Sequence, residues 1–136
     1  MGRFNLCFGC ETFTSRFQYT VDAWGWEVPA GSVKPDQTER EAAVCELKEE
    51  VGGETEDALL EIGRFYTANG ICNELGVYYL ATNVTLGKPA HEAAEVMEIH
   101  LKPIDEVLHM AHSGQINDGN TVLALLTCAE KLRALR

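Results

Sequence analysis

One acidic helix, bounded by glycines, constrains the fold more than any other segment of the chain. It is expected to begin at Asp36 or Thr38, because either side chain can accept a hydrogen bond from the first helical turn. It is expected to run to about Val51, where the Gly52–Gly53 pair supplies left-handed residues that end a helix. The loop before it is expected to span residues 31 to 36.

The periodicity of this helix separates an apolar face from an acidic one. At 100° per residue, one arc of about 100° holds the apolar positions Ala43, Val44, Leu47 and Val51. The neighbouring arc holds Glu46, Glu49 and Glu50, with Glu39 on the same side. Like charges four residues apart destabilise a helix by roughly 0.2 to 0.5 kcal/mol a pair. The acidic arc is therefore either a solvated face or a set of ligands for a hard divalent cation.

Shorter elements surround this helix. One or two strands are expected in residues 1–20, and further strands in residues 24–30, 59–67, 76–82 and 96–101. Pro103 opens a helix to about Ser113, and Asp118 or Asn120 starts a last helix with apolar residues Val122, Leu125, Leu126, Ala129 and Leu132. The interleaving of strands and helices predicts a single α/β (α+β) domain over residues 1–136.

Charge and composition exclude several classes of partner. The chain has 21 acidic and 11 basic side chains, a formal net charge of -10, and no basic cluster, so nucleic acid is not expected to bind. No run of 18 apolar residues and no secretory signal are present, so we expect a cytoplasmic protein with no membrane contact. The five cysteines are odd in number and scattered, which fits a reducing compartment in which most are buried thiols.

The acidic helix and its flanking glycines resemble the Nudix box, G-x5-E-x7-R-E-U-x-E-E-x-G-U, where U is aliphatic. Gly31, Glu46, Leu47, Glu49, Glu50 and Gly52 fall in register with it. Gln37, Cys45 and Gly53 replace the family's glutamate, arginine and aliphatic residue. The resemblance implies a Nudix fold, with a mixed β-sheet sandwiched between helices.

The resemblance also implies a metal site. In the family, the residues that match Glu46, Glu49 and Glu50 bind divalent metal ions, which predicts Mg2+ or Mn2+ as the cofactor. The residues that match Gln37 and Cys45 orient the helix through a charged contact. Glutamine and cysteine cannot form that ion pair, so reduced catalysis, or a binding module without catalysis, is the alternative interpretation.

The segment before the box, WEVPAG over residues 26–31, resembles the entry to the ADP-ribose pyrophosphatase branch of the family. In that branch, the residue that matches Ala30 offers its carbonyl to a metal ion. Residues 65–74 resemble the next signature of the branch, a strand followed by a loop of the type S-P-G-x-x-x-E. The resemblance thus implies substrate-binding residues at Trp26, Glu27, Gly31, Gly70 and Glu74. A tryptophan in a strand is otherwise a core or interface residue, so the alternative for Trp24 and Trp26 stays open.

A later acidic loop of the branch assists the attacking water or an additional metal ion. Its counterparts here are Glu92 and Glu95, which with Glu49 are the candidate catalytic residues. The alternative is that Glu92 and Glu95 are ordinary loop acids. The resemblance implies hydrolysis of the diphosphate linkage of ADP-ribose or a related nucleoside diphosphate sugar. It also implies a homodimer, although the N-terminal segment is shorter than is usual for the branch.

Overall fold

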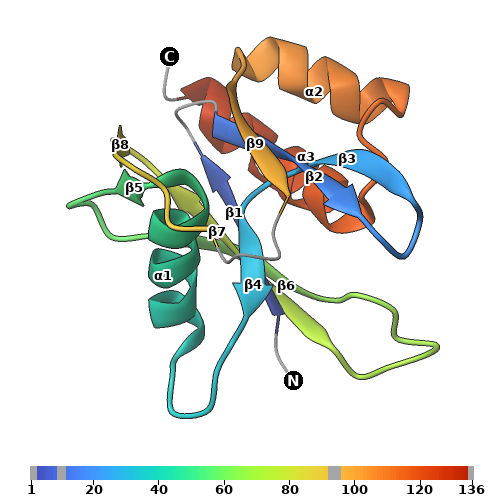
Figure 1. The fold of residues 1–136 in the computed structure, drawn as a ribbon, viewed down its shortest axis with the longest axis horizontal. Coiled ribbons are helices and arrows are strands. Elements are labelled where there is room, and N and C mark those ends of the chain that lie inside the picture. Colours follow the sequence, from blue (N-terminus) through green and yellow to red (C-terminus); the bar gives the residue numbers. More distant parts are fainter. Residues whose placement is uncertain (1–2, 9–11, 92–95, 135–136) are drawn as a thin grey trace.

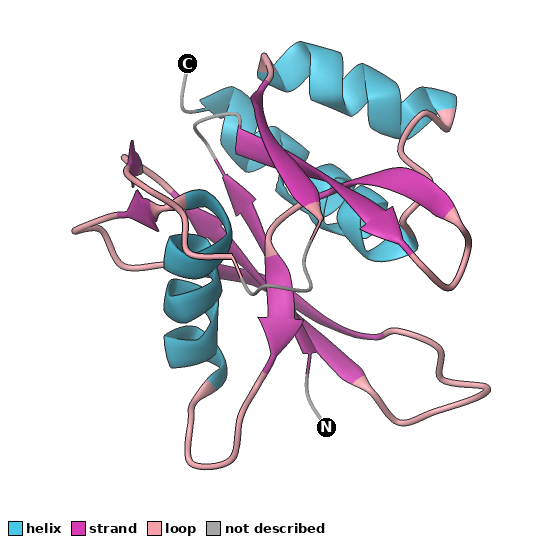
Figure 2. Cartoon of the chain, in the orientation of Figure 1, coloured by secondary structure: helices cyan, strands magenta, loops and turns pink. Residues whose placement is uncertain are grey.

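The computed structural model describes residues 3–8, 12–91 and 96–134. This part of the chain forms nine strands and three helices (Figures 1 and 2). In chain order they are β1 Arg3–Phe8, β2 Thr12–Gln18, β3 Ala23–Glu27, β4 Ala30–Ser32, α1 Glu39–Val51, β5 Gly53–Glu54, β6 Leu60–Tyr66, β7 Leu75–Ala81, β8 Thr85–Leu86, β9 Met97–Leu101, α2 Ile104–Ser113 and α3 Gly119–Ala134. The three predicted helices are therefore present. So are the predicted strands, except that residues 24–30 divide between two strands, and the short β5–β8 pair is additional.

Three sheets organise the strands. The largest has the order β4-β1-β7-β6, in which β1 runs parallel to β7 and the other neighbours are antiparallel. The second has the order β3-β2-β9 and is antiparallel, and β5 and β8 form the third. A parallel pair needs a long crossover, and the chain between β1 and β7 contains α1.

Strand β7 is buried on both faces and separates two apolar cores. Val77 and Tyr79 pack with Leu47 of α1, whereas Tyr78 and Leu80 face the side of α2 and α3. A strand covered on both faces reads as a continuous apolar run, which is what residues 77–81 are. The predicted architecture, a mixed sheet between helices, is confirmed, and Figure 1 shows α1 on one side and α2 and α3 on the other.

The predicted strand over residues 24–30 is wrong in its continuity. Strand β3 ends at Glu27 and belongs to one sheet, and Ala30 begins β4 in another. Between them the Val28 N–H donates to the Thr121 hydroxyl at 3.2 Å, and Pro29 has no N–H to offer a ladder. The predicted loop from Gly31 is also shorter, because residues 30–32 pair with β1.

Helix α1 begins and ends as its sequence predicts, with one correction. Thr38 is the N-cap and forms a capping box with Glu41, and Gly52 ends the helix with φ 66°. Gly53 does not share this left-handed conformation, because it starts β5. It is small for a different reason: a Cβ there would lie 2.5 Å from Leu47 Cδ1.

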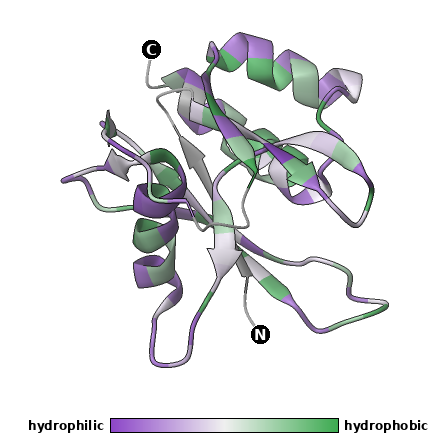
Figure 3. Cartoon of the chain, in the orientation of Figure 1, coloured by the Kyte–Doolittle hydropathy of each residue, from purple (hydrophilic) through white to green (hydrophobic). Residues whose placement is uncertain are grey.

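The packing faces of α1 and α3 are rotated from the predicted ones. Val44 is 50% exposed and Leu126 is 40% exposed, so neither belongs to the core. The buried residues of α1 are Ala42, Ala43, Leu47, Glu50 and Val51, and those of α3 include Ala124, Leu125 and Cys128. Small alanines let the helices approach the sheet closely, and Glu50 can enter because it finds polar partners. Figure 3 shows the alternating apolar and polar turns along α1 and α2. No helix in the described ranges is long and apolar enough to span a bilayer.

Candidate active site

The last turn of α1 meets β2 and the start of β4, and Glu50 joins all three elements. Its Oε2 accepts a hydrogen bond from the Ala30 N–H at 3.1 Å. Its Oε1 forms an ion pair with the guanidinium of Arg16 on β2. Both carboxylate oxygens are thus held by groups from outside the helix.

Burial dominates the electrostatics of Glu50. The residue is 2% exposed, and this desolvation raises the pKa of Glu50 to about 7 from an ordinary value of 4.5. The Arg16 charge and the Ala30 N–H oppose the shift by lowering the pKa, whereas the nearby charge of Glu46 raises it further. A carboxyl group with this pKa exchanges its proton near neutral pH.

Gly31 is the place where Glu46 approaches the same strand. A Cβ added to Gly31 would lie 2.0 Å from Glu46 Oε1 and 2.2 Å from its carboxyl carbon. The absence of a side chain at Gly31 therefore makes room for the Glu46 carboxylate, without any requirement for positive φ. Glu46 and Glu50 consequently both lie beside Ala30–Gly31.

The chemistry of this donor set fits a hard divalent cation only in part. Glu46, Glu50 and the Ala30 carbonyl are oxygen donors of the kind that Mg2+ and Mn2+ prefer. Within the described ranges, however, no three His, Cys, Asp or Glu side chains lie close enough to hold a metal ion. Glu49 is half-buried, and its carbonyl accepts a hydrogen bond from the Ala90 N–H at 2.8 Å. Its role as a ligand stays a prediction.

Gln37 and Cys45 touch one another at the positions where the family has an ion pair. The Gln37 side-chain amide donates to Cys45 Sγ at 3.6 Å, and its Oε1 accepts from the Lys34 N–H at 3.2 Å. A hydrogen bond to neutral sulfur is weaker than a charged contact.

The thiol of Cys45 is exposed, as is that of Cys72, so the expectation of mostly buried thiols is wrong for the described cysteines.

A cavity of about 610 Å³ has in its wall Ala30, whose N–H donates to the Glu50 carboxylate. Residues of the β2–β3 hairpin, Glu27 and Ala30 line one side, and Asn117, Asp118 and Asn120 line the other. Glu27 accepts a hydrogen bond from the Gln18 side chain, which fixes both at the cavity wall. The volume is in the range of small-molecule sites, which is roughly 300 to 1,000 Å³.

The two tryptophans have different surroundings. Trp26 is half-buried against the core, packs edge-on to His100 with ring centroids 4.8 Å apart, and has the Lys102 ammonium 5.0 Å from its ring centre. These contacts favour the core interpretation for Trp26. Trp24 is 50% exposed and lines the cavity.

Other predicted site residues lie elsewhere. Gly70 and Glu74 belong to the loop between β6 and β7, which in Figure 1 projects away from α1. Glu74 accepts a hydrogen bond from the Thr67 hydroxyl of the same loop at 2.8 Å. The structure does not bring this loop to Glu46 and Glu50. Glu92 and Glu95 lie outside the described residues.

Sequence reasoning missed Arg16, Gln18 and Asn117. Arg16 is 34 residues away from its partner Glu50 and sits in a strand whose alternation of apolar residues is irregular. No local spacing could connect them. Asn117 lies between α2 and α3 and lines the cavity opposite the β2–β3 hairpin, which is about a hundred residues away in sequence.

The chain is similar to known proteins over most of its length. The NUDIX domain family model matches residues 13–124. A CMP-5'-(N-acetyl-N-hydroxy-3-aminopropyl)phosphonate hydrolase from Streptomyces rubellomurinus is 27% identical over 111 residues, which are 82% of this chain and 53% of the relative. An ADP-ribose pyrophosphatase from Bacillus subtilis is 30% identical over 115 residues, which are 79% of this chain and 60% of the relative.

The chain thus spans between half and two thirds of the length of these curated relatives. A crystal structure of an ADP compounds hydrolase matches with a TM-score of 0.86 at 18% identity, over 98% of this chain and 74% of that one, which shows the same fold. The family match covers the box, both carboxylates and the cavity wall from β2 to α3. The chain belongs to the Nudix family.

Proposed function

We propose that the protein is a divalent-metal-dependent Nudix hydrolase that cleaves the diphosphate linkage of ADP-ribose or a related nucleoside diphosphate sugar. The observation that carries this proposal is the meeting of Glu46 and Glu50 at Ala30–Gly31, beside a cavity of about 610 Å³. Two carboxylates next to an open cavity are suited to a cation that bridges protein and phosphate.

The named relatives support the substrate class. One is named for a CMP derivative and another for ADP-ribose, so a nucleotide joined to a second group is what they share. The bases differ between these names, and so the choice of ADP-ribose rests on the WEVPAG segment and the later signatures of the same branch, together with the relative named for ADP-ribose. Glu27 and Gly31 of that segment are the proposed substrate contacts. We leave Trp26 out because its ring packs against the core, and Gly70 and Glu74 because their loop projects away from α1.

In the proposed mechanism, Glu46, Glu49, Glu50 and the Ala30 carbonyl would hold Mg2+ or Mn2+. Such a cation lowers the pKa of an attacking water and neutralises charge on phosphate oxygens. Glu50 would lose its proton on binding the metal ion, and the ion pair with Arg16 would hold the Glu50 carboxylate beside Ala30. Glu92 or Glu95 would accept the proton as the water oxygen bonds to one phosphorus of the diphosphate. The bond from that phosphorus to the bridging oxygen would break, and the bridging oxygen would leave with the other phosphate, which gives two monophosphates.

A binding module that holds a nucleotide sugar without cleaving it is the second candidate. The neutral contact between Gln37 and Cys45 favours it, because this contact orients α1 less firmly than an ion pair would. A misplacement of about 1 Å in a catalytic group lowers a rate by on the order of a hundredfold.

The test is hydrolysis of a panel of nucleoside diphosphate sugars and dinucleotides with Mg2+ or Mn2+, in which a phosphatase releases phosphate from each monophosphate product. We expect turnover that disappears with a chelator and is highest for ADP-ribose. No turnover, together with thermal stabilisation by the same compounds, would overturn the hydrolase and support the binding module. A cytoplasmic homodimer of one Nudix domain belongs to the same proposal, and sedimentation analysis tests the dimer.

A further inference from the structure

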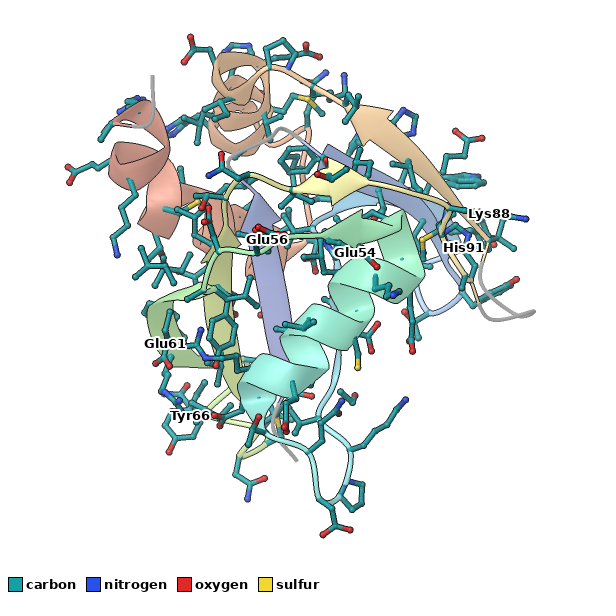
Figure 4. All side chains as sticks on the ribbon, turned by 90° about the vertical axis from the view of Figure 1, so that its left-hand side faces the viewer. Glu54, Glu56, Glu61, Tyr66, Lys88 and His91 are labelled. Atoms are coloured by element: carbon teal, nitrogen blue, oxygen red, sulfur yellow. The ribbon has the colours of Figure 1, made fainter. Side chains whose placement is uncertain are left out.

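The segment Gly87–His91 runs along the C-terminal end of α1. Three of its groups donate hydrogen bonds to carbonyls there: the Gly87 N–H to Gly52 O at 2.6 Å, the Ala90 N–H to Glu49 O at 2.8 Å, and the His91 imidazole Nε2 to Glu50 O at 2.7 Å. Figure 4 shows Lys88 and His91 beside this end of the helix. We refer to residues 87–91 as the strap.

The last carbonyls of a helix have no partner within it, and they must find one elsewhere. In α1 the N–H of Gly52 bonds to the carbonyls of Leu47 and Lys48. Glu49 and Glu50 follow, and their carbonyls receive the strap donors instead. The strap therefore caps the two residues whose side chains form the acidic turn.

Close packing fixes the register of the strap on the helix. A Cβ on Gly52 would lie 2.5 Å from the Gly87 carbonyl oxygen and 2.8 Å from the Lys88 carbonyl carbon. Backbone therefore rests directly on backbone at this point. A shift of the strap by one residue would remove all three hydrogen bonds together.

His91 is the member of the strap that bonds through its side chain. A carbonyl oxygen has no proton, so Nε2 carries the hydrogen and donates it. Glu50 is then held twice, through its carbonyl by His91 and through its carboxylate by Arg16 and the Ala30 N–H. This is the arrangement required of a ligand whose direction must not drift.

The acidic turn needs such support. Glu46 and Glu50 repel one another, and Glu50 lies in the last turn of α1, where the helix dipole has its negative end. Helix ends fray more readily than helix centres. Donors from the strap oppose both tendencies, because they bind the carbonyls that carry the negative end of the dipole.

We propose that His91 is a positioning residue that holds the Glu49–Glu50 turn of α1 in its metal-binding arrangement. The inference rests on the proposed function, because it takes the turn to be a metal site. His91 contacts the helix backbone and not a reacting group. Its loss should therefore weaken metal binding while the fold persists.

The experiment measures Mn2+ affinity without substrate, from the electron paramagnetic resonance signal of free Mn2+. The variants are His91→Leu and His91→Asn, which cannot place a donor at the Nε2 position, and His91→Gln, whose amide nitrogen can. We expect about tenfold weaker binding for the first two and recovery to within about threefold for His91→Gln. The matched control is His112→Leu, at an exposed histidine of α2, which should bind Mn2+ as the wild type does.

Circular dichroism reports whether each variant is folded, and His91→Asn keeps the comparison available if His91→Leu does not fold. Unchanged Mn2+ affinity in a folded His91→Leu or His91→Asn would overturn the inference and leave the proposed function standing. Equal weakening in His91→Gln would also overturn it, because a donor would not then be the cause. A wild-type protein that binds no Mn2+ would instead remove the metal site, and both proposals with it.

Discussion

The two ends of α1 are both acidic, yet their glutamates have different environments. At the N-terminal end, Glu41 closes the capping box with Thr38, and Glu39 forms a bidentate pair with Arg64 with both oxygens at 3.1 Å. At the C-terminal end, Glu50 is buried and Glu46 lies against Gly31. The first pair is exposed or half-exposed, and the second pair lies against Ala30–Gly31, of which Ala30 lines the cavity.

The acids at the N-terminal end stabilise the helix, whereas those at the C-terminal end destabilise it. Negative charge is favourable at a helix N-terminus and unfavourable at its C-terminus. The Thr38 N–H and hydroxyl accordingly lower the pKa of Glu41, whereas burial raises the pKa of Glu50. Glutamates that oppose the fold at the C-terminal end point to a function that requires them there.

The largest expected effect comes from replacing a glutamate at each end by glutamine. Glu50→Gln should lower metal-dependent turnover by about a hundredfold or more, because it removes a charged ligand. The fold should persist, since a neutral amide is easier to bury and can still accept from the Ala30 N–H. Glu41→Gln is the matched control and should stay within about twofold of the wild type. Equal turnover in the two variants would abolish the distinction between the ends.

Gly52→Ala should show how much the packing of the strap on the C-terminal end of α1 contributes to the free energy of unfolding. The residue has φ 66°, and its Cβ would lie 2.5 Å from the Gly87 carbonyl oxygen. We expect a loss of about 2 kcal/mol in the free energy of unfolding, measured with urea on the metal-free protein. A variant as stable as the wild type would mean that the strap does not rest on the helix as described.

Gly31→Ala should act on the site and leave the fold intact. The new methyl group occupies the space of the Glu46 carboxylate, which is a flexible side chain and can move away. We expect Mn2+ affinity to fall by about tenfold, with a change in unfolding free energy of at most about 0.5 kcal/mol. If affinity were unchanged, Glu46 would not be a ligand.

Metal binding should depend on pH through Glu50. The folded, metal-free protein holds its proton up to a pKa of about 7, against 4.5 ordinarily, so a metal ion must displace this proton at lower pH. We expect Mn2+ affinity about tenfold lower at pH 6 than at pH 8. The folded state of the metal-free protein binds this proton more tightly than the unfolded state does. The free energy of unfolding should therefore fall as pH rises from 4.5 to about 7. An affinity that is flat over pH 6 to 8 would contradict this assignment.

The smallest effect belongs to the N-terminal end. Thr38→Ala removes the capping hydrogen bonds and should lower the free energy of unfolding by about 1 kcal/mol. Thr38→Ser retains the hydroxyl and should preserve most of the stability. Turnover should be unaffected in both, and a fall in turnover would show that the two ends are coupled.

Local chemistry made one part of the fold predictable. The helix bounds followed from Thr38 and Gly52, and the strands followed from runs of β-branched and aromatic residues. The break at Val28–Pro29, where the chain passes from the sheet of β3 to the sheet of β4, was not predictable in the same way. It depends on a contact with Thr121, which is far away in sequence.

The site residues were likewise predictable only where they are close together in sequence. Glu46 and Glu50 could be selected from their spacing, because both stand on one helix. Arg16 could not, since a strand in another sheet brings it to Glu50. Val44 shows the limit within a single helix, because periodicity gives an apolar arc and not the rotation with which it meets the sheet. The buried Glu50, and not Val44, lies on the side of α1 that faces the sheet.

The measurement that tests the account most directly is an anomalous difference map from crystals grown with Mn2+. We predict a peak about 2 Å from carboxylate oxygens of Glu46 and Glu50 and from the Ala30 carbonyl oxygen. A saturating Mn2+ concentration that leaves this place empty, or a peak only at the N-terminal acids Glu39 and Glu41, would contradict it.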